Sequence, residues 1–81
     1  MTIRFESQPR KYLSKVQESV SKRLLDAING IPERKGDIRK LEGMPNMYRL
    51  KIHHFRVLFR RDKETDSIII TAINTRTNIK Y

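Results

Sequence analysis

The sequence contains no cysteine and no tryptophan, and it has no long apolar run. The absence of cysteine excludes a disulfide framework, a thiolate nucleophile and a cysteine-based metal site, and it suits a reducing cytoplasm. No apolar stretch approaches the ~20 residues that span a bilayer, and the first ten residues lack the apolar core of a signal peptide. We therefore expect a cytoplasmic protein with no membrane partner.

Acidic residues are scarce beside basic ones. The 81 residues carry 18 Lys and Arg against 9 Asp and Glu, which gives a net charge of +9. Such an excess favours polyanionic partners, namely nucleic acid, an acidic membrane surface or an acidic protein. A chain of this length forms one small domain, residues 1–81, with room for one modest hydrophobic core.

The segment from Tyr48 to Asp62 predicts a β-hairpin. Apolar and polar residues alternate on both sides of His53-His54, as expected for two half-buried strands. If these histidines form a two-residue turn, the turn fixes the register and places six large apolar side chains on one face. In that register three apolar pairs lie opposite each other: Ile52 and Phe55, Leu50 and Val57, and Tyr48 and Phe59.

The same register places cations on the other face of the hairpin. Lys51 lies opposite Arg56, and the neighbouring pairs are Arg49 with Leu58 and Met47 with Arg60. Two cations directly opposite each other repel and weaken the sheet. A sequence that keeps this arrangement indicates a positively charged surface at this place.

The remaining segments predict an α+β fold. Thr2 to Phe5 alternates like a short strand, and apolar residues then recur at three- and four-residue steps. This periodicity alone predicts one helix from Pro9 to Asn29, with Ser7 as N-cap and Gly30 as its end. Residues 37–41 are typical of an edge strand, and residues 67–75, with three consecutive isoleucines, of a strand inside the sheet.

Two motifs, KLEGMPNMYRLKI and FRVLFRRD, precede the closing strand that leads to Arg76 and Tyr81. Together they resemble the RelE/ParE toxin superfamily of toxin–antitoxin systems, and more closely its RelE-type mRNA interferases. The resemblance covers nearly the whole chain. It implies the order β-α-α-β-β-β-β, an antiparallel-rich sheet, two N-terminal helices on one face and a basic groove on the other. It also implies a break in the helix between Ser14 and Gln17.

The resemblance further implies a ribosome-dependent endoribonuclease that needs no metal and no cofactor. The family's catalytic positions correspond here to five residues: Arg49, Lys51, Arg56, Arg76 and Tyr81. Arg60 and Lys80 are expected to add charge for RNA binding, and His54 is a possible additional acid or base.

RNA cleavage without a metal uses the neighbouring 2′-OH as nucleophile and requires a base, cations for the phosphate and an acid for the leaving oxygen. Lys51 is the candidate base because a neighbouring cation such as Arg56 disfavours the charged form of a lysine. Arg49 and Arg56 are candidate phosphate clamps, since a guanidinium stays charged and binds phosphate oxygens in a fork. Arg76 either does the same or neutralises the leaving group, and Tyr81 is suited to stack on a base.

Each of these residues also has a purely structural interpretation. Solvated residues of an ordinary strand would give the same pattern at Arg49, Lys51 and Arg60. Both histidines are also typical of turn residues, because His tolerates a positive φ. Two adjacent histidines lack a third metal ligand, and no Ser/His/Asp arrangement stands out.

The expected partners are an acidic cognate antitoxin, the ribosome and mRNA, with operator DNA contacted only through the antitoxin complex. Two other functions remain open. One is a ParE-like toxin that inhibits DNA gyrase, and the other is a non-catalytic basic module that binds nucleic acid.

Overall fold

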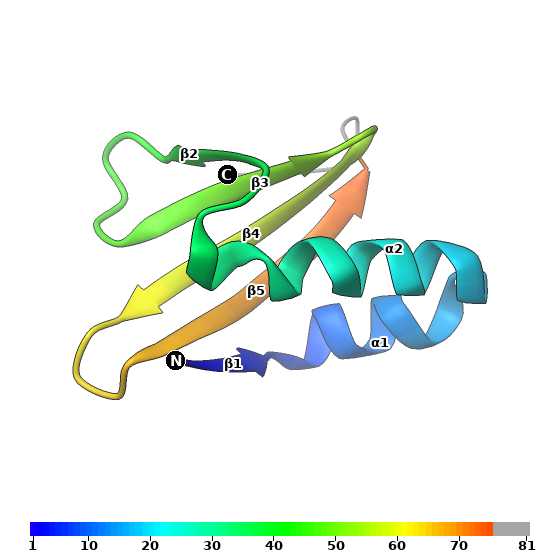
Figure 1. Cartoon of the computed structure of the whole chain (residues 1–81), viewed down its shortest axis with the longest axis horizontal. Coiled ribbons are helices and arrows are strands. Elements are labelled where there is room, and N and C mark those ends of the chain that lie inside the picture. Colours follow the sequence, from blue (N-terminus) through cyan, green and yellow to red (C-terminus); the bar gives the residue numbers. More distant parts are fainter. Residues whose placement is uncertain (76–81) are drawn as a thin grey trace.

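The computed structural model describes residues 1–75 and shows two helices packed against a five-stranded sheet (Figure 1). The sheet has the order β1-β5-β4-β3-β2, in which β1 runs parallel to β5 and the other neighbours are antiparallel. The predicted α+β class and element order are therefore confirmed. The elements are β1 (Thr2–Phe5), α1 (Ser7–Lys15), α2 (Glu18–Asn29), the 3-10 turn η1 (Ile31–Glu33), β2 (Asp37–Lys40), β3 (Met47–Ile52), β4 (Phe55–Asp62) and β5 (Ser67–Thr75).

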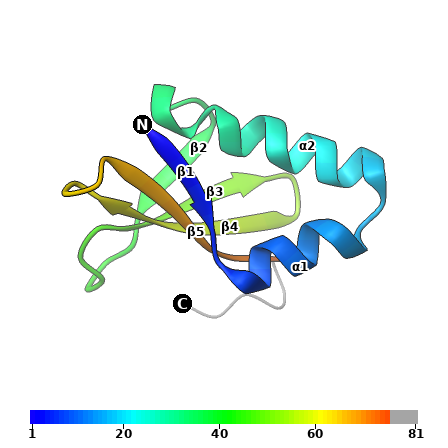
Figure 2. The same ribbon diagram turned by 90° about the horizontal axis from the view of Figure 1, so that it is seen from below.

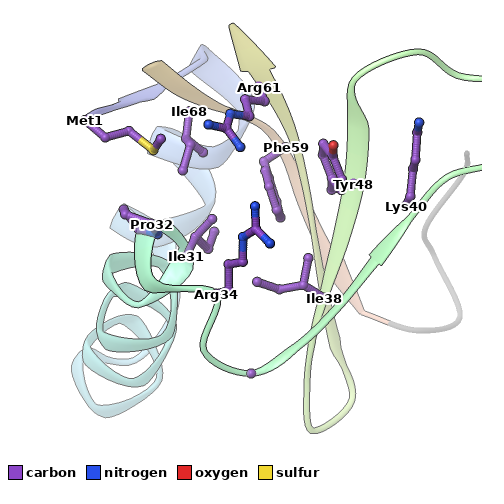
Figure 3. Close-up of a pocket in the computed structure, with 11 residues that line it drawn as sticks. Met1, Ile31, Pro32, Arg34, Ile38, Lys40, Tyr48, Phe59, Arg61 and Ile68 are labelled. Atoms are coloured by element: carbon purple, nitrogen blue, oxygen red, sulfur yellow. The ribbon is translucent and has the colours of Figure 1, made fainter. Parts of the chain in front are cut away.

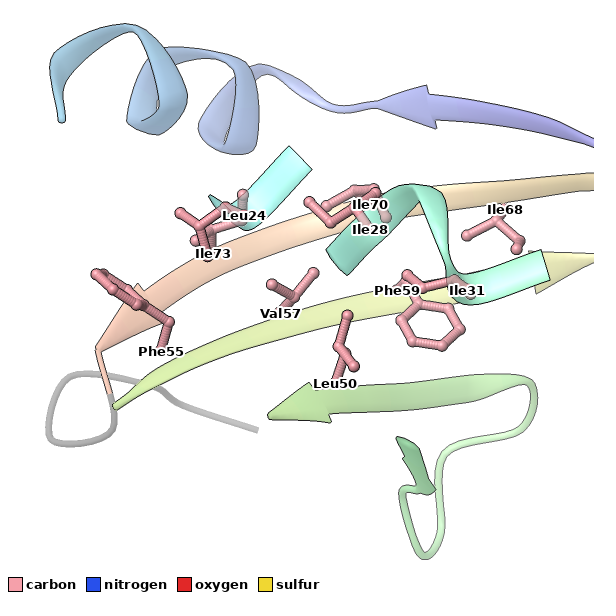
Figure 4. Packing of buried hydrophobic residues seen from close by; sticks show 10 residues of the cluster. All are labelled: Leu24, Ile28, Ile31, Leu50, Phe55, Val57, Phe59, Ile68, Ile70 and Ile73. Carbon is pink, nitrogen blue, oxygen red and sulfur yellow. The ribbon is translucent and has the colours of Figure 1, made fainter. Parts of the chain in front are cut away.

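The hydrophobic core lies between the helices and one face of the sheet (Figures 2 and 4). Leu24 and Ile28 of α2 are fully buried, and Tyr12 of α1 makes an edge-to-face contact with Phe55 at 6.4 Å. Each fully buried Leu, Ile or Phe side chain contributes about 1.5–3 kcal/mol of transfer free energy. Within residues 1–75, neither helix is long and apolar enough to cross a membrane. The buried cluster consists of Leu24, Ile28, Ile31, Leu50, Phe55, Val57, Phe59, Ile68, Ile70 and Ile73.

The helical segment is broken in two, so the single helix predicted from periodicity is wrong and the break implied by the resemblance is correct. Val16 and Gln17 are extended, with ψ angles of 164° and 148°. The break lets α1 pack against β1 and β5 while α2 packs against β3. Ser7 is also not the N-cap: Glu6 holds that position without a side-chain cap, and its N–H donates to Ile70 O at 3.0 Å, next to the pairing of β1 with β5.

The β3–β4 hairpin has the predicted register. Ile52 pairs with Phe55, and the other two apolar pairs and the three pairs on the opposite face follow as expected. His53 adopts the positive φ of 51° that the turn interpretation requires. Tyr48 and Phe59 stack with their ring centroids 5.4 Å apart.

Strand β5 carries a bulge that the sequence pattern does not reveal. The β4–β5 register shifts between Leu58 and Phe59, so that Thr71 has no partner in the ladder, and its Oγ1 donates to Leu58 O at 3.2 Å. The extra residue changes the alternation along the strand. As a result Ile73, three residues after Ile70, faces the same core.

The turn between β4 and β5 is held by Asp62. Its Oδ1 accepts the N–H of Glu64 at 3.0 Å and that of Thr65 at 3.4 Å. The hydrogen bond from Thr65, with smaller contributions from Glu64 and Arg60, holds the pKa of the Asp62 carboxyl below its usual value.

Candidate nucleic-acid interface

The face of the sheet away from the helices carries cations from three adjacent strands. Leu50 and Val57 point into the core, so the residues that alternate with them on β3 and β4 point to the other side. On β2, Asp37 pairs with Lys51 and Arg39 pairs with Arg49, which places both β2 residues on this side as well. We call this surface the basic face, and it contains Arg39, Arg49, Lys51, Arg56 and Arg60.

Arg56 is fixed by the hairpin turn. Its side chain is buried, with 7% of the residue exposed, and Nη1 donates to His53 O at 3.1 Å and to Phe55 O at 3.0 Å. These two carbonyl contacts satisfy one end of the guanidinium and hold the group beside the turn. The other nitrogen atoms of its planar fork are the ones suited to a phosphate oxygen.

Lys51 lies between two residues of opposite charge. It is exposed, and its direct cross-strand neighbours are Arg56 on β4 and Asp37 on β2. The lysine therefore has a cation on one side and a carboxylate on the other. Pairing with Arg56 agrees with the expected register, but the carboxylate of Asp37 is a neighbour that the sequence reasoning did not include.

Arg49 brings an unsatisfied donor to the basic face. The residue is half-buried, and its Nε is buried without a hydrogen-bond partner among the residues that the structure describes. Its β2 neighbour Arg39 has Nε 3.5 Å from Asp37 Oδ1, in an ion pair that is largely exposed. A buried guanidinium nitrogen without an acceptor costs free energy, which an incoming phosphate oxygen would relieve.

The remaining described candidates lie at the ends of this surface. His54 is exposed, and its ring centroid is 4.2 Å from that of Phe55, next to Arg56 in the chain. Arg60 is exposed and lies four residues along β4, about 13 Å from Arg56 at the usual rise of a strand.

Arg76, Lys80 and Tyr81 lie outside the described residues, so their predicted roles stay predictions. Within the described chain, the structure brings Arg49, Lys51 and Arg56 together as expected and adds Asp37 and Arg39. The sequence indicated a strand at residues 37–41 but not its register, which alone places these two side chains beside the hairpin. Residues 1–75 contain no group of three or more His, Asp or Glu side chains arranged to hold a metal ion.

Comparisons with known proteins show which fold the chain has. No protein-family model and no curated protein sequence matches the chain. Among solved structures, the RelBE toxin–antitoxin complex of E. coli matches with a TM-score of 0.77 and 20% identity, over 91% of this chain and 94% of that chain. The archaeal RelE–RelB complex of Pyrococcus horikoshii OT3 matches with a TM-score of 0.76 and 22% identity, over 96% and 97%.

The isolated E. coli RelE toxin matches with a TM-score of 0.79 and 19% identity, over 91% of this chain and 82% of that chain. The chain therefore has the fold of the RelE toxins, over almost its whole length.

Proposed function

We propose that this protein is the toxin component of a type II toxin–antitoxin system and cleaves mRNA in the decoding site of the ribosome. The observation that carries the proposal is the cluster of Lys51, Arg49 and Arg56 on adjacent strands of a sheet with the RelE fold. Two of the matching structures are complexes of a RelE toxin with a RelB antitoxin. The net charge of +9 suits both an RNA substrate and an acidic antitoxin.

In the proposed reaction, the 2′ oxygen forms a bond to the adjacent phosphorus and the bond from phosphorus to the 5′ oxygen breaks. The products are a 2′,3′-cyclic phosphate and a 5′-hydroxyl end. Lys51 Nζ takes the proton from the 2′-OH, while Arg49 and Arg56 stabilise the charge that grows on the phosphoryl oxygens. His54 would donate a proton to the leaving 5′ oxygen, or Arg76 would neutralise its charge until water protonates it. Tyr81 would stack on a neighbouring base.

The experiment that tests this proposal is translation in vitro with the purified protein, followed by primer extension on the mRNA. We expect cuts in phase with the reading frame that require ribosomes. Lys51→Gln should reduce the cleavage rate by about 100-fold or more, since positioned acid–base groups contribute 10²–10⁴. The matched control is Lys22→Gln, which removes the same charge from an exposed position on α2.

Two results would overturn the proposal. Inhibition of DNA gyrase without mRNA cuts would indicate the ParE-like alternative. Salt-dependent binding to free RNA, with no cuts in the presence of translating ribosomes, would indicate a non-catalytic nucleic-acid-binding module.

A further inference from the structure

An uncharged polar side chain lies at one end of a row of charged residues on the basic face. Arg56 on β4 pairs with Asn74 on β5, just as Lys51 on β3 pairs with Arg56. Residues that pair directly share a face of the sheet, and Ile73, which precedes Asn74, lies in the core on the other face. Asn74 therefore points to the basic face. The row across four strands consists of Asp37, Lys51, Arg56 and Asn74.

The amide of Asn74 lies next to the place proposed for the reacting phosphate. Neighbouring strands are about 4.8 Å apart, so Asn74 is one strand away from Arg56 and two from Lys51. A phosphate held by these two cations brings the adjacent nucleotide within reach of the amide. At the other end of the row, the carboxylate of Asp37 repels the RNA backbone. The charges along the row thus direct the neighbouring base toward β5 and not toward β2.

The backbone around Asn74 is held from both sides. On one side, β4 pairs with β5 as far as Thr75, the partner of Phe55. On the other side, beyond the residues that β1 pairs with, Gln8 Nε2 donates to Ile73 O and Gln8 Oε1 accepts the N–H of Ile73, both at 2.9 Å. A side chain that discriminates between bases requires such a rigid support, because a displacement of about 1 Å already loosens the contact geometry.

The amide group offers a contact that the neighbouring cations do not. Contacts of Lys and Arg with phosphates fix the position of a nucleic acid but carry no sequence information, which is read at the edges of the bases. An Asn side chain presents a donor and an acceptor side by side, and this pair matches N7 and the N6 amino group of adenine. Guanine presents two acceptors at the same edge and is matched by Arg instead. Asn74 is half-buried, so part of its surface is open to a base.

We infer that the side chain of Asn74 reads the base next to the reacting phosphate and favours adenine. Its Nδ2 donates to N7 of the base, and its Oδ1 accepts a hydrogen bond from the N6 amino group. The inference rests on the proposed function in that it takes RNA as the ligand of the basic face. It adds a preference for one base and assigns that preference to one side chain on β5.

The test measures binding apart from cleavage, with single-stranded RNA whose 2′-O-methyl groups prevent the reaction. Each probe is a short oligouridylate in which one central base is adenine, 7-deazaadenine, guanine or cytosine. Fluorescence anisotropy gives the dissociation constant of each probe. The native protein should bind the adenine probe at least about fivefold more tightly than the 7-deazaadenine probe, which lacks N7, and than the probes with other bases.

Two variants assign the preference to Asn74. Asn74→Ala removes the amide and should bind the adenine probe no more tightly than the 7-deazaadenine probe. The matched control, Asn29→Ala, removes an exposed amide at the end of α2 and should keep the full preference for adenine. Circular dichroism in urea checks that each variant is folded. The comparison of adenine with 7-deazaadenine uses the native protein, so it tests the contact even if Asn74→Ala is unstable.

Cut sites on translated mRNA provide a second measurement. With the native protein, adenine should be enriched at one position beside the cut. Asn74→Ala should lose this enrichment while its cuts stay in phase with the reading frame, and Asn29→Ala should keep it.

The inference is overturned if the native protein binds the 7-deazaadenine probe as tightly as the adenine probe or prefers another base. It is equally overturned if Asn74→Ala keeps the preference, or if Asn29→Ala loses it as well. A preference for adenine that depends on Asn74, without any cleavage on ribosomes, would sink the proposed function alone. Ribosome-dependent cuts without such a preference would sink this inference alone.

Discussion

At the residue scale, Arg56 has a structural role and, in the proposed reaction, also a chemical one. Its Nη1 donates to two carbonyl groups of the turn that sets the hairpin register, and the same guanidinium lies beside Lys51. Loss of activity on substitution of Arg56 is therefore informative only if the stability of the hairpin is measured as well.

We expect Arg56→Ala to lower the free energy of unfolding by about 1.5–3 kcal/mol, the range for hydrogen bonds from a charged donor to buried partners. Urea denaturation followed by circular dichroism measures this change. Arg60→Ala, on the same strand but exposed, should stay within about 0.5 kcal/mol of the native protein. Equal stability of the two variants would show that the carbonyl contacts of Arg56 contribute nothing to folding.

Asp37 provides a second prediction at this scale. Its carboxylate faces Lys51 across the β2–β3 ladder and forms an ion pair with Arg39, so its negative charge repels a phosphate that approaches the basic face. Asp37→Asn should therefore raise the cleavage rate at neutral pH about two- to tenfold, the effect of removing one partly screened charge. The rate of mRNA cleavage on ribosomes measures this effect.

Asp26→Asn removes the same charge from an exposed position on α2 and is the control. A slower reaction in Asp37→Asn would contradict the interpretation and would assign Asp37 a direct part in the chemistry.

At the element scale, the side chain of Gln8 in α1 forms two hydrogen bonds to the sheet. Gln8 Oε1 accepts the N–H of Ile73 at 2.9 Å, and its Nε2 donates to the Ile73 carbonyl at 2.9 Å. Ile73 lies beyond the part of β5 that pairs with β1, which is Ser67 to Ile70. The side chain of Gln8 thus takes the place of the next residue of a neighbouring strand.

We expect Gln8→Ala to lower the free energy of unfolding by about 1–3 kcal/mol, because both backbone groups of Ile73 lose their partner. Hydrogen exchange of the Ile73 amide should also become faster. Gln17→Ala is the control, since Gln17 precedes α2 and its side chain forms no cap. A Gln8 variant that exchanges as slowly as the native protein would show that water or a shifted strand replaces the contact.

The elements also show how far local sequence rules reach. The hairpin register follows from one two-residue turn and alternating residues, and both are local, so the sequence predicts it completely. The bulge at Thr71 and the break at Val16 depend on how β5 and the helices fit the rest of the molecule. The alternating pattern places the basic face on β3 and β4, but the positions of Asp37 and Arg39 depend on how β2 pairs with β3.

At the scale of the whole molecule, the sheet separates two positively charged surfaces with different characters. The basic face has cations on three strands and a buried, unsatisfied nitrogen of Arg49, which suits phosphates. On the helix-covered side, Arg34 and Arg61 line a hollow whose floor is formed by apolar side chains, among them Ile38 and Phe59 (Figure 3). If RNA binds to the basic face, its affinity should depend on the cations of that face and not on the whole net charge of +9.

Salt dependence tests this separation. For a single-stranded nucleic acid, the logarithm of the binding constant falls with the logarithm of the salt concentration, with a slope of about −0.7 for each neutralised phosphate. Contact with all five cations of the basic face therefore gives a slope of about −3.5. Arg39→Gln should reduce the magnitude of that slope by about 0.7, because one contact is lost. Arg61→Gln removes the same charge from the helix-covered side of the sheet and should leave the slope unchanged. Fluorescence anisotropy of a labelled, non-cleavable RNA over a range of KCl concentrations measures both slopes. If the two variants changed the slope equally, RNA would respond to the net charge of the protein and not to the strands that form the basic face.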